Sequence, residues 1–217
     1  MPGDVPEVPT AVTAAASDQS AIVIWSPPAD TGGFDIQSYD LIIHRSNGAD
    51  VLVNTGSSAT SYNATSLTNG ISYSFQVIAR TSFGISDTST LSNVVIPAGS
   101  PGTPTGLTAV PRNSALQISF TAPTVTGGVA LSKYVVETSG DGSSWTLVAN
   151  SSISRTSDTA TTLTVNGLVN GSPVFVRISA KNIAGVTGNG AVATGTPLSP
   201  ADPPTVSITG GDSTAQI

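Results

Sequence analysis

The stretch that decides the fold of this chain is residues 67–79, which read LTNGISYSFQVIA. In its second half Tyr73, Phe75 and Val77 alternate with single intervening residues, so they share one face of an extended chain. Successive side chains of a β-strand point to opposite faces of its sheet, so this alternation predicts a strand with one buried face.

Two earlier runs, residues 21–25 and 39–43, follow the same two-residue period. No window keeps the 3.6-residue period of a helix, and Gly and Pro interrupt the chain too often for long helices. Short strands separated by turn signals are typical of a β-sandwich. The predicted inward side chains are Ala21, Val23, Trp25, Tyr39, Leu41 and Ile43, and the predicted outward ones are Ile22, Ile24, Asp40, Ile42 and His44.

Two glycine-containing steps mark expected hairpin turns. Ser46-Asn47-Gly48 and Gly140-Asp141-Gly142 both lie between strand-like runs. Asn-Gly and Asp-Gly tolerate the positive φ values that a tight hairpin turn requires. We therefore predict a tight turn at both places.

The chain also repeats itself after about 95–100 residues, a period long enough for a whole domain. Many matched positions in one order are hard to produce by chance. The matches are Pro9-Thr10 with Pro104-Thr105 and Pro204-Thr205, Trp25 with Phe120, Pro28 with Pro123, Gly32-Gly33 with Gly127-Gly128, Tyr39 with Tyr134, Leu67-Thr68-Asn69-Gly70 with Leu168-Val169-Asn170-Gly171, Ala79-Arg80 with Ala180-Lys181, and Gly84 with Gly185.

The repeat divides the chain into two complete domains and the start of a third. We expect an N-terminal tail at residues 1–5, a first domain at 6–97, a linker at 98–103 and a second domain at 104–198. Residues 199–217 are expected to hold a further linker and a truncated third repeat. Both linkers are rich in proline, which favours extended backbone, so the domains are expected to lie in line.

The second copy also indicates which face of the first copy points outward. Its run at residues 116–120 alternates cleanly, with Gln117 and Ser119 at the polar positions. The aligned residues of the first copy are Ile22 and Ile24. Two outward isoleucines fit either a scattered or locally covered apolar surface or an assembly contact on the first domain.

These features resemble tandem fibronectin type III domains. The resemblance is carried by Pro9-Thr10, Trp25, Pro27-Pro28, Tyr39 and residues 67–79. It implies an all-β chain of two immunoglobulin-like β-sandwiches in tandem.

In that family a tyrosine corner, in which a tyrosine hydroxyl bonds back to the chain, is implied at Tyr73. The second copy departs from the pattern, because Phe120 replaces the tryptophan and Val174 replaces the tyrosine. We expect the corner hydrogen bond to be missing there and the second domain to be less regular at that point.

Composition excludes several classes of function. The chain has 217 residues, 9% of them charged, against about 25% in an average globular protein. Ser and Thr supply 31 and 29 residues, so surface polarity comes from hydroxyls. A net charge of -6 with seven basic residues argues against nucleic-acid binding, and no apolar run is long enough for membrane insertion. With no cysteine, disulfides, thiolate nucleophiles and Cys-ligated zinc are impossible.

No catalytic or cofactor-binding residues are predicted, and the chain is not expected to be an enzyme. A nucleophilic triad needs a base beside the nucleophile, and His44 is the only histidine. The pattern places it outward on a strand next to Arg45. Most of the 11 Asp and 2 Glu residues lie in turn-like segments, unlike the paired carboxylates of a glycosidase.

No metal site is predicted either, although one group of aspartates could form one. Asp30, Asp35 and Asp40 bracket one loop and can in principle gather Ca²⁺, but Asp is also common in loops. The second copy has no acid at the corresponding positions.

The stretch at residues 139–145, SGDGSSW, resembles the Asp-box hairpins of sialidase-like propellers. The simpler interpretation is a hairpin turn followed by a strand whose Trp145 covers a sheet edge.

The leading functional hypothesis is therefore a non-catalytic structural or binding module, acting in adhesion or spacing on a phage virion (fibre, tail or capsid decoration) or a bacterial cell surface. Its partner is expected to be a protein or a surface glycan. The amino terminus shows no secretory signal, which fits a piece of a larger secreted protein, a protein released without secretion, or a cytoplasmic one. The alternative is a spacer within a secreted polysaccharide-degrading enzyme.

The alternation makes one stability prediction. Trp25→Ala is expected to destabilise the first domain by about 3–5 kcal/mol, because it deletes a large buried aromatic side chain. Chemical denaturation measures the change. A mutant as stable as the parent chain contradicts the predicted register.

Overall fold

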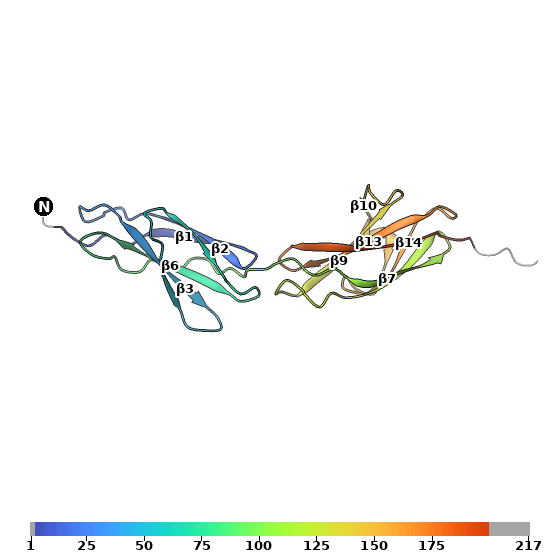
Figure 1. The fold of residues 1–217 in the computed structure, drawn as a ribbon, viewed down its shortest axis with the longest axis horizontal. Helices are drawn as coiled ribbons and strands as arrows, with labels where there is room; N and C mark the ends of the chain where they lie inside the picture. Colours follow the sequence, from blue (N-terminus) through green and yellow to red (C-terminus); the bar gives the residue numbers. More distant parts are fainter. Residues whose placement is uncertain (1–2, 200–217) are drawn as a thin grey trace, which may run out of the picture.

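The computed structural model describes residues 3–199, which form two β-sandwiches arranged end to end (Figure 1). Domain 1 holds strands β1 to β6, and domain 2 holds β7 to β14. Within the described residues, helix is confined to one 3-10 turn, η1 (Asn150–Ser152), and no helix there is long or apolar enough to cross a membrane. The predicted third repeat, from Pro204 onward, lies outside the described residues.

Domain 1 consists of two antiparallel sheets, as the alternation predicted. The first has the strand order β1-β2-β5, and the second has the order β4-β3-β6. The strands are β1 (Thr10–Ser17), β2 (Ser20–Ser26), β3 (Ser38–Arg45), β4 (Val51–Asn54), β5 (Ser61–Thr65) and β6 (Tyr73–Arg80).

Domain 2 repeats this arrangement with more strands. Its sheets have the orders β11-β12-β8-β7 and β10-β9-β13-β14. The strands are β7 (Thr105–Arg112), β8 (Ala115–Thr121), β9 (Leu131–Ser139), β10 (Thr146–Leu147), β11 (Ile153–Ser154), β12 (Thr162–Asn166), β13 (Val174–Asn182) and β14 (Thr187–Gly195).

The core of each domain lies between its two sheets and is built on one aromatic pair. In domain 1 the rings of Trp25 and Tyr39 meet edge to face with centroids 5.1 Å apart. Phe120 and Tyr134 make the same contact in domain 2 at 4.6 Å. Trp25 is 6% exposed, so the predicted inward register of its strand is confirmed.

The outward register of β2 is confirmed as well. Ile22 and Ile24 are 55% and 51% exposed, although they flank the fully buried Val23. Asp40 differs from expectation. It points away from the core, but its side chain is buried by Asn54 and Arg80, which extend over it from the strands on either side.

The tyrosine corner is present in domain 1, where the Thr68 N–H donates to the Tyr73 hydroxyl at 2.9 Å. Val174 cannot accept this bond in domain 2. The expected loss of regularity is nevertheless wrong at the turn itself. Gly70 N–H donates to Pro97 O at 2.9 Å, and Gly171 N–H donates to the equivalent Pro197 O at 2.8 Å. Backbone hydrogen bonds therefore hold both turns in the same shape.

Both predicted hairpins form, but each is closed by a loop longer than a two-residue turn. Ile43 pairs with Val51 and Thr138 pairs with Thr146, so the two loops have the same length. Gly142 has a φ of +74°, whereas no residue of Ser46-Asn47-Gly48 has positive φ. The predicted positive φ is therefore present only in the second loop. Arg45 closes the first loop by donating from Nε to Ala49 O at 2.8 Å.

The last edge of domain 1 is made by serine side chains instead of a regular strand. Ser86, Ser89 and Ser92 are buried, and their N–H groups donate to backbone oxygens of β6. In return the N–H groups of Ala79, Val77 and Phe75 donate to the Oγ atoms of Ser86, Ser89 and Ser92 at 2.9, 2.9 and 3.0 Å.

We call this arrangement the serine ladder. Its serines are three residues apart along their segment, whereas the β6 residues that they bind are two residues apart, so the two backbones cannot pair residue by residue. Hydroxyl oxygens take the place of the missing backbone acceptors. A buried N–H without an acceptor is costly, which explains the serine at every third position. Domain 2 needs no such device, because β14 pairs regularly with β13 along the equivalent edge, apart from one register shift.

The ladder predicts that Ser89→Ala destabilises domain 1 by about 1–3 kcal/mol, because the buried Val77 N–H loses its acceptor. The exposed neighbour Thr88 supplies the control, and Thr88→Ala should change stability by less than about 0.5 kcal/mol. Urea denaturation followed by NMR signals of domain 1 measures both. Equal effects of the two variants would exclude the ladder as a source of stability.

Candidate functional site

The segment that joins the two domains lies against domain 2 and is not free in solvent. Pro97, Ala98, Gly99 and Pro101 are all buried. Gly99 N–H donates to Gly127 O at 2.9 Å, and Gly102 N–H donates to Val125 O at 2.8 Å. The linker is therefore held by backbone hydrogen bonds to the 125–128 loop in addition to the stiffness of its prolines.

The turn of domain 1 at Asn69-Gly70 touches the same loop of domain 2. A Cβ atom on Gly70 would lie 2.1 Å from Gly128 O. A Cβ atom on Gly128 would lie 2.4 Å from Asn69 Cβ. Both glycines also have positive φ, +83° and +90°. The two backbones can approach this closely only because neither glycine carries a side chain.

Two asparagines fix the surfaces that meet there. In domain 1, Asn69 Oδ1 accepts from Gln19 N–H at 2.9 Å, and its Nδ2 donates to Asp18 Oδ1 at 2.7 Å. In domain 2 the buried Asn182 donates from Nδ2 to Gly99 O at 3.0 Å and to Thr126 O at 3.2 Å. Asn182 thus ties the linker to the loop on which the turn of domain 1 rests.

Sequence reasoning aligned these glycines but did not recognise their role. The available signal was that Gly-Gly and Asn-Gly occur at matching places in both copies. Periodicity says nothing about which loops meet between domains. We define the junction as residues 69–70, 97–102 and 125–128 together with Asn182.

His44, the only histidine of the chain, is held in a structural network. Its Nδ1 lies 2.9 Å from Asp50 Oδ2, and its Nε2 lies 2.9 Å from Gln76 Oε1. Gln76 in turn donates from Nε2 to Ser89 O at 2.6 Å. Both ring nitrogens therefore have partners, which leaves His44 no free nitrogen to act as a base.

The three aspartates considered for calcium are not brought together. Asp30 Oδ1 accepts from Gly32 N–H at 2.8 Å within its own loop. Asp40 binds Arg80 and Asn54, and the Arg80 hydrogen bond holds the pKa of Asp40 below its ordinary value. Among residues 3–199, no group of three or more His, Cys, Asp or Glu side chains is arranged to hold a metal ion.

The hairpin that resembles an Asp-box is closed by Asp141. Its carboxylate accepts from the N–H groups of Ser143 and Ser144 at 2.8 and 2.7 Å, and from the Ser139 hydroxyl at 2.8 Å. These hydrogen bonds, the Ser144 N–H first, hold the pKa of Asp141 well below its ordinary value. The carboxylate is thus committed to shaping the turn.

Trp145 does not cover a sheet edge as predicted. The Arg177 guanidinium lies over its ring, 4.3 Å from the ring centroid, and Arg177 also donates to Glu137 Oε2 at 2.7 Å. Arg177 lies between the buried Val176 and Ile178 on β13, so it points outward. Trp145 therefore packs on the outer face of the sheet, because a cation–π contact is available there.

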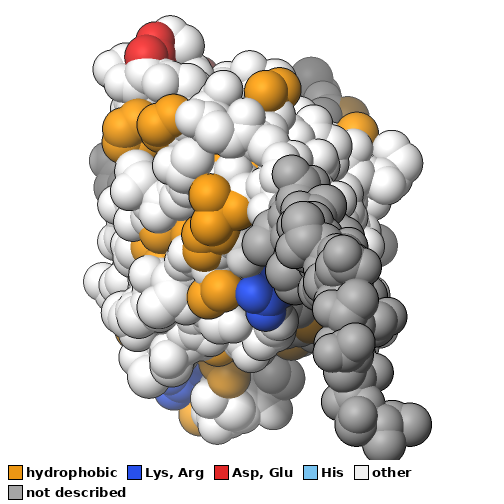
Figure 2. Space-filling model, turned by 90° about the vertical axis from the view of Figure 1, so that its right-hand side faces the viewer, with side chains coloured by type: hydrophobic (Ala, Val, Ile, Leu, Met, Phe, Trp, Pro, Cys, Tyr) orange, Lys and Arg blue, Asp and Glu red, His pale blue; other side chains and the backbone are white. Residues whose placement is uncertain are grey.

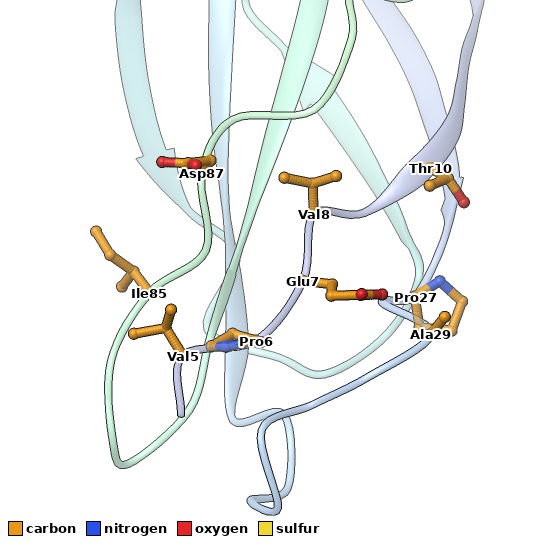
Figure 3. Close-up of a pocket in the computed structure, with 9 residues that line it drawn as sticks. All are labelled: Val5, Pro6, Glu7, Val8, Thr10, Pro27, Ala29, Ile85 and Asp87. Carbon is orange, nitrogen blue, oxygen red and sulfur yellow. The ribbon is translucent and has the colours of Figure 1, made fainter. Parts of the chain in front are cut away.

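The free end of domain 1 holds a shallow groove (Figure 3). The N-terminal segment, the loop after β2 and the segment after β6 form its walls. Its charged side chains, Glu7 and Asp87, are both acidic, and no basic side chain lines it. The lining residues are Val5, Pro6, Glu7, Val8, Thr10, Pro27, Ala29, Ile85 and Asp87.

The family model of the fibronectin type III domain matches residues 7–95. Residues 7–95 are a fibronectin type III domain. Domain 2 repeats its sheets and core, so the chain holds two such β-sandwiches in tandem. The fold is one that proteins use for binding and structural roles.

Two curated relatives extend the comparison over both domains. Cardiac-type myosin-binding protein C of Rattus norvegicus is 30% identical over 195 residues, which cover 85% of this chain and 14% of that protein. A Kelch domain-containing protein of Saccharolobus solfataricus is 29% identical over 185 residues, covering 80% of this chain and 24% of that protein. The chain therefore spans less than a quarter of either relative.

Among solved structures, the FN1-FN3 domains of chicken CNTN1 are 16% identical, with a TM-score of 0.42. That match covers 89% of this chain and 67% of the other.

The first fibronectin type III domain also exposes apolar side chains on its outer faces. Ile22 and Ile24 are flanked on β1 by Ala15 and Thr13, whose short side chains leave both isoleucines prominent. On the opposite sheet, Leu52 of β4 is 61% exposed. These side chains are free to contact another surface.

The junction predicts that Gly128→Ala loosens the two domains, because the new Cβ collides with Asn69. Gly33 is the matched control. It aligns with Gly128, has a φ of +86°, and has no atom within 4 Å of an added Cβ. Both variants should destabilise their own domain by about 1–3 kcal/mol through backbone strain.

Only Gly128→Ala should broaden the distribution of interatomic distances seen by small-angle X-ray scattering. Identical scattering from the two variants would contradict a junction built on glycine contact.

Proposed function

We propose that this chain is a non-catalytic spacer that holds two fibronectin type III domains at a fixed separation on the outside of a phage virion or a bacterial cell. The single observation that carries the proposal is the junction. Domains within one chain ordinarily move relative to one another unless their interface is large. Here backbone hydrogen bonds and glycine contacts replace a large interface.

The surface chemistry supports a display role. Charged residues make up only 9% of the chain, whereas hydroxyl side chains are abundant. With no cysteine, folding does not depend on the redox state of the compartment. Such a chain can fold in a reducing cytoplasm and keep the same structure once displayed outside.

Domain 1 supplies the contact surface of the proposed spacer. Ile22 and Ile24 lie side by side on one face of β2, and the aligned Gln117 and Ser119 make the same face of domain 2 polar. An apolar pair of this kind fits a protein surface. In this arrangement domain 1 is fixed in an assembly, and domain 2 projects from it.

The absence of cysteine makes the test simple, since introduced cysteines are the only labelling sites. Spin labels at Ser58→Cys and Thr159→Cys, both exposed and one in each domain, report the separation of the domains. We expect one narrow distance distribution that is unchanged between about 0.05 and 1 M salt, because the junction uses hydrogen bonds and not screened surface charges. A broad distribution would refute the spacer role.

A further inference from the structure

The sequence holds five Asn-Gly steps, in which no glycine side chain hinders attack of the glycine nitrogen on the asparagine side chain. We infer that one of them, Asn47-Gly48, is a spontaneous modification site at which Asn47 is converted to aspartate or isoaspartate. This inference is independent of the proposed spacer role, which rests on the junction. The other four steps are Asn69-Gly70, Asn166-Gly167, Asn170-Gly171 and Asn189-Gly190.

The conversion needs only water besides the chain itself. The Gly48 nitrogen gives up its proton and forms a bond to Cγ of Asn47, while the bond from Cγ to Nδ2 breaks and ammonia leaves with that proton. The product is a five-membered cyclic imide. Water then breaks the bond from the nitrogen to Cγ, which yields aspartate, or the bond to the main-chain carbonyl carbon, which yields isoaspartate. Nothing is oxidised or reduced.

The Asn69-Gly70 step is held on both sides of the bond that would form. Asn69 Oδ1 accepts from Gln19 N–H at 2.9 Å, and Nδ2 donates to Asp18 Oδ1 at 2.7 Å. Gly70 N–H donates to Pro97 O at 2.9 Å. The side chain cannot turn toward the glycine nitrogen without losing these hydrogen bonds, so the step is protected.

The Asn170-Gly171 step is protected in the same way. Asn170 Oδ1 accepts from Ser114 N–H at 2.8 Å, and Nδ2 donates to Asn113 Oδ1 at 3.0 Å. Gly171 N–H donates to Pro197 O at 2.8 Å. Both the amide group and the nucleophile are therefore engaged.

The remaining two steps are restrained by their strands. Asn166, the last residue of β12, donates from Nδ2 to Ser154 Oγ at 3.0 Å. Asn189 is the sharpest comparison, because its side chain is exposed. It lies in β14, and Gly190 pairs there with Ser179 of β13. Strand pairing holds the backbone, so the imide ring forms there only when this edge opens.

The Asn47-Gly48 step has none of these restraints. It lies in the loop that joins β3 to β4, at the tip of a hairpin that projects from domain 1 (Figure 1). Both residues are exposed. Among residues 3–199, no hydrogen bond involves the Asn47 side chain or the Gly48 N–H. The amide group is therefore free to meet the glycine nitrogen.

The Arg45 guanidinium lies against this step. Arg45 Nε donates to Ala49 O at 2.8 Å, which lays the side chain across the loop. A Cβ atom on Gly48 would lie 2.7 Å from Arg45 Nε and 3.1 Å from Cζ, so the guanidinium approaches the backbone where other residues carry a side chain. A positive charge this close stabilises a Gly48 nitrogen that has lost its proton. Arg45 therefore promotes ring closure at this step.

The product differs from the parent chain in charge and keeps its fold. Its net charge is one unit more negative than the -6 of the parent chain. Charged side chains make up 9% of the chain, and few are visible on the face drawn in Figure 2. One added carboxylate on so sparsely charged a surface shifts elution from an anion-exchange column. Pairing of Ile43 with Val51 fixes the base of the loop, so the change stays local.

Prolonged incubation of the whole chain at mildly alkaline pH tests the inference. Tandem mass spectrometry of its peptides follows the amide group at each of the five asparagines. In the folded chain we expect loss of the amide at Asn47 alone. In urea, where hydrogen bonds and strand pairing are gone, all five should lose it at similar rates. Retention of the Asn47 amide in the folded chain, or equally fast loss at Asn189, would overturn the inference.

Variants of the loop test the part played by Arg45. Arg45→Gln should slow the loss of the Asn47 amide severalfold in the folded chain and leave its rate in urea unchanged. Arg45→Lys keeps the positive charge and should restore most of the rate. Faster loss in Arg45→Gln would show that Arg45 restrains the loop, and the inferred promotion would fail. Asn47→Gln, whose longer side chain disfavours the five-membered ring, is the negative control and should give no second anion-exchange peak.

Discussion

The approach of two backbones, Gly70 of one domain and Gly128 of the other, is the constraint on which the shape of this molecule depends. A single methyl group on either glycine would collide with the opposite chain. Around that contact the linker pairs with the 125–128 loop, and Asn182 holds both in place. The interface is small, and it combines this close backbone approach with the directional hydrogen bonds that hold the linker to the two domains.

In domain 1, serine hydroxyl groups accept hydrogen bonds that backbone carbonyl groups would accept from a regular strand. The serine ladder of domain 1 supplies acceptors to the buried N–H groups of Phe75, Val77 and Ala79. Domain 2 solves the same edge with a regular strand, β14. The two domains therefore share a fold and differ in how one edge is satisfied. An abundance of serine in such a chain is in part structural.

The ionisable groups considered for catalysis, for calcium binding and for an Asp-box hairpin are engaged in structural hydrogen bonds and ion pairs. His44 bridges Asp50 and Gln76, Asp40 binds Arg80, and Asp141 accepts the hydrogen bonds of its own turn. Since the pKa of Asp40 is lowered in the folded state, its pairing stabilises domain 1 above the ordinary aspartate pKa and is lost as the pH falls below it. These groups stabilise the modules.

Local pattern was enough to predict the strands and the core. Trp25, Tyr73 and Phe75 are buried where alternation placed them, because a strand with one wet face must alternate. Tertiary structure decided what depends on residues distant in the chain. Arg80 and Asn54 bury Asp40 from neighbouring strands, and Arg177 draws Trp145 onto a sheet face. The glycines of the junction belong to this second class, because their role appears only where two domains meet.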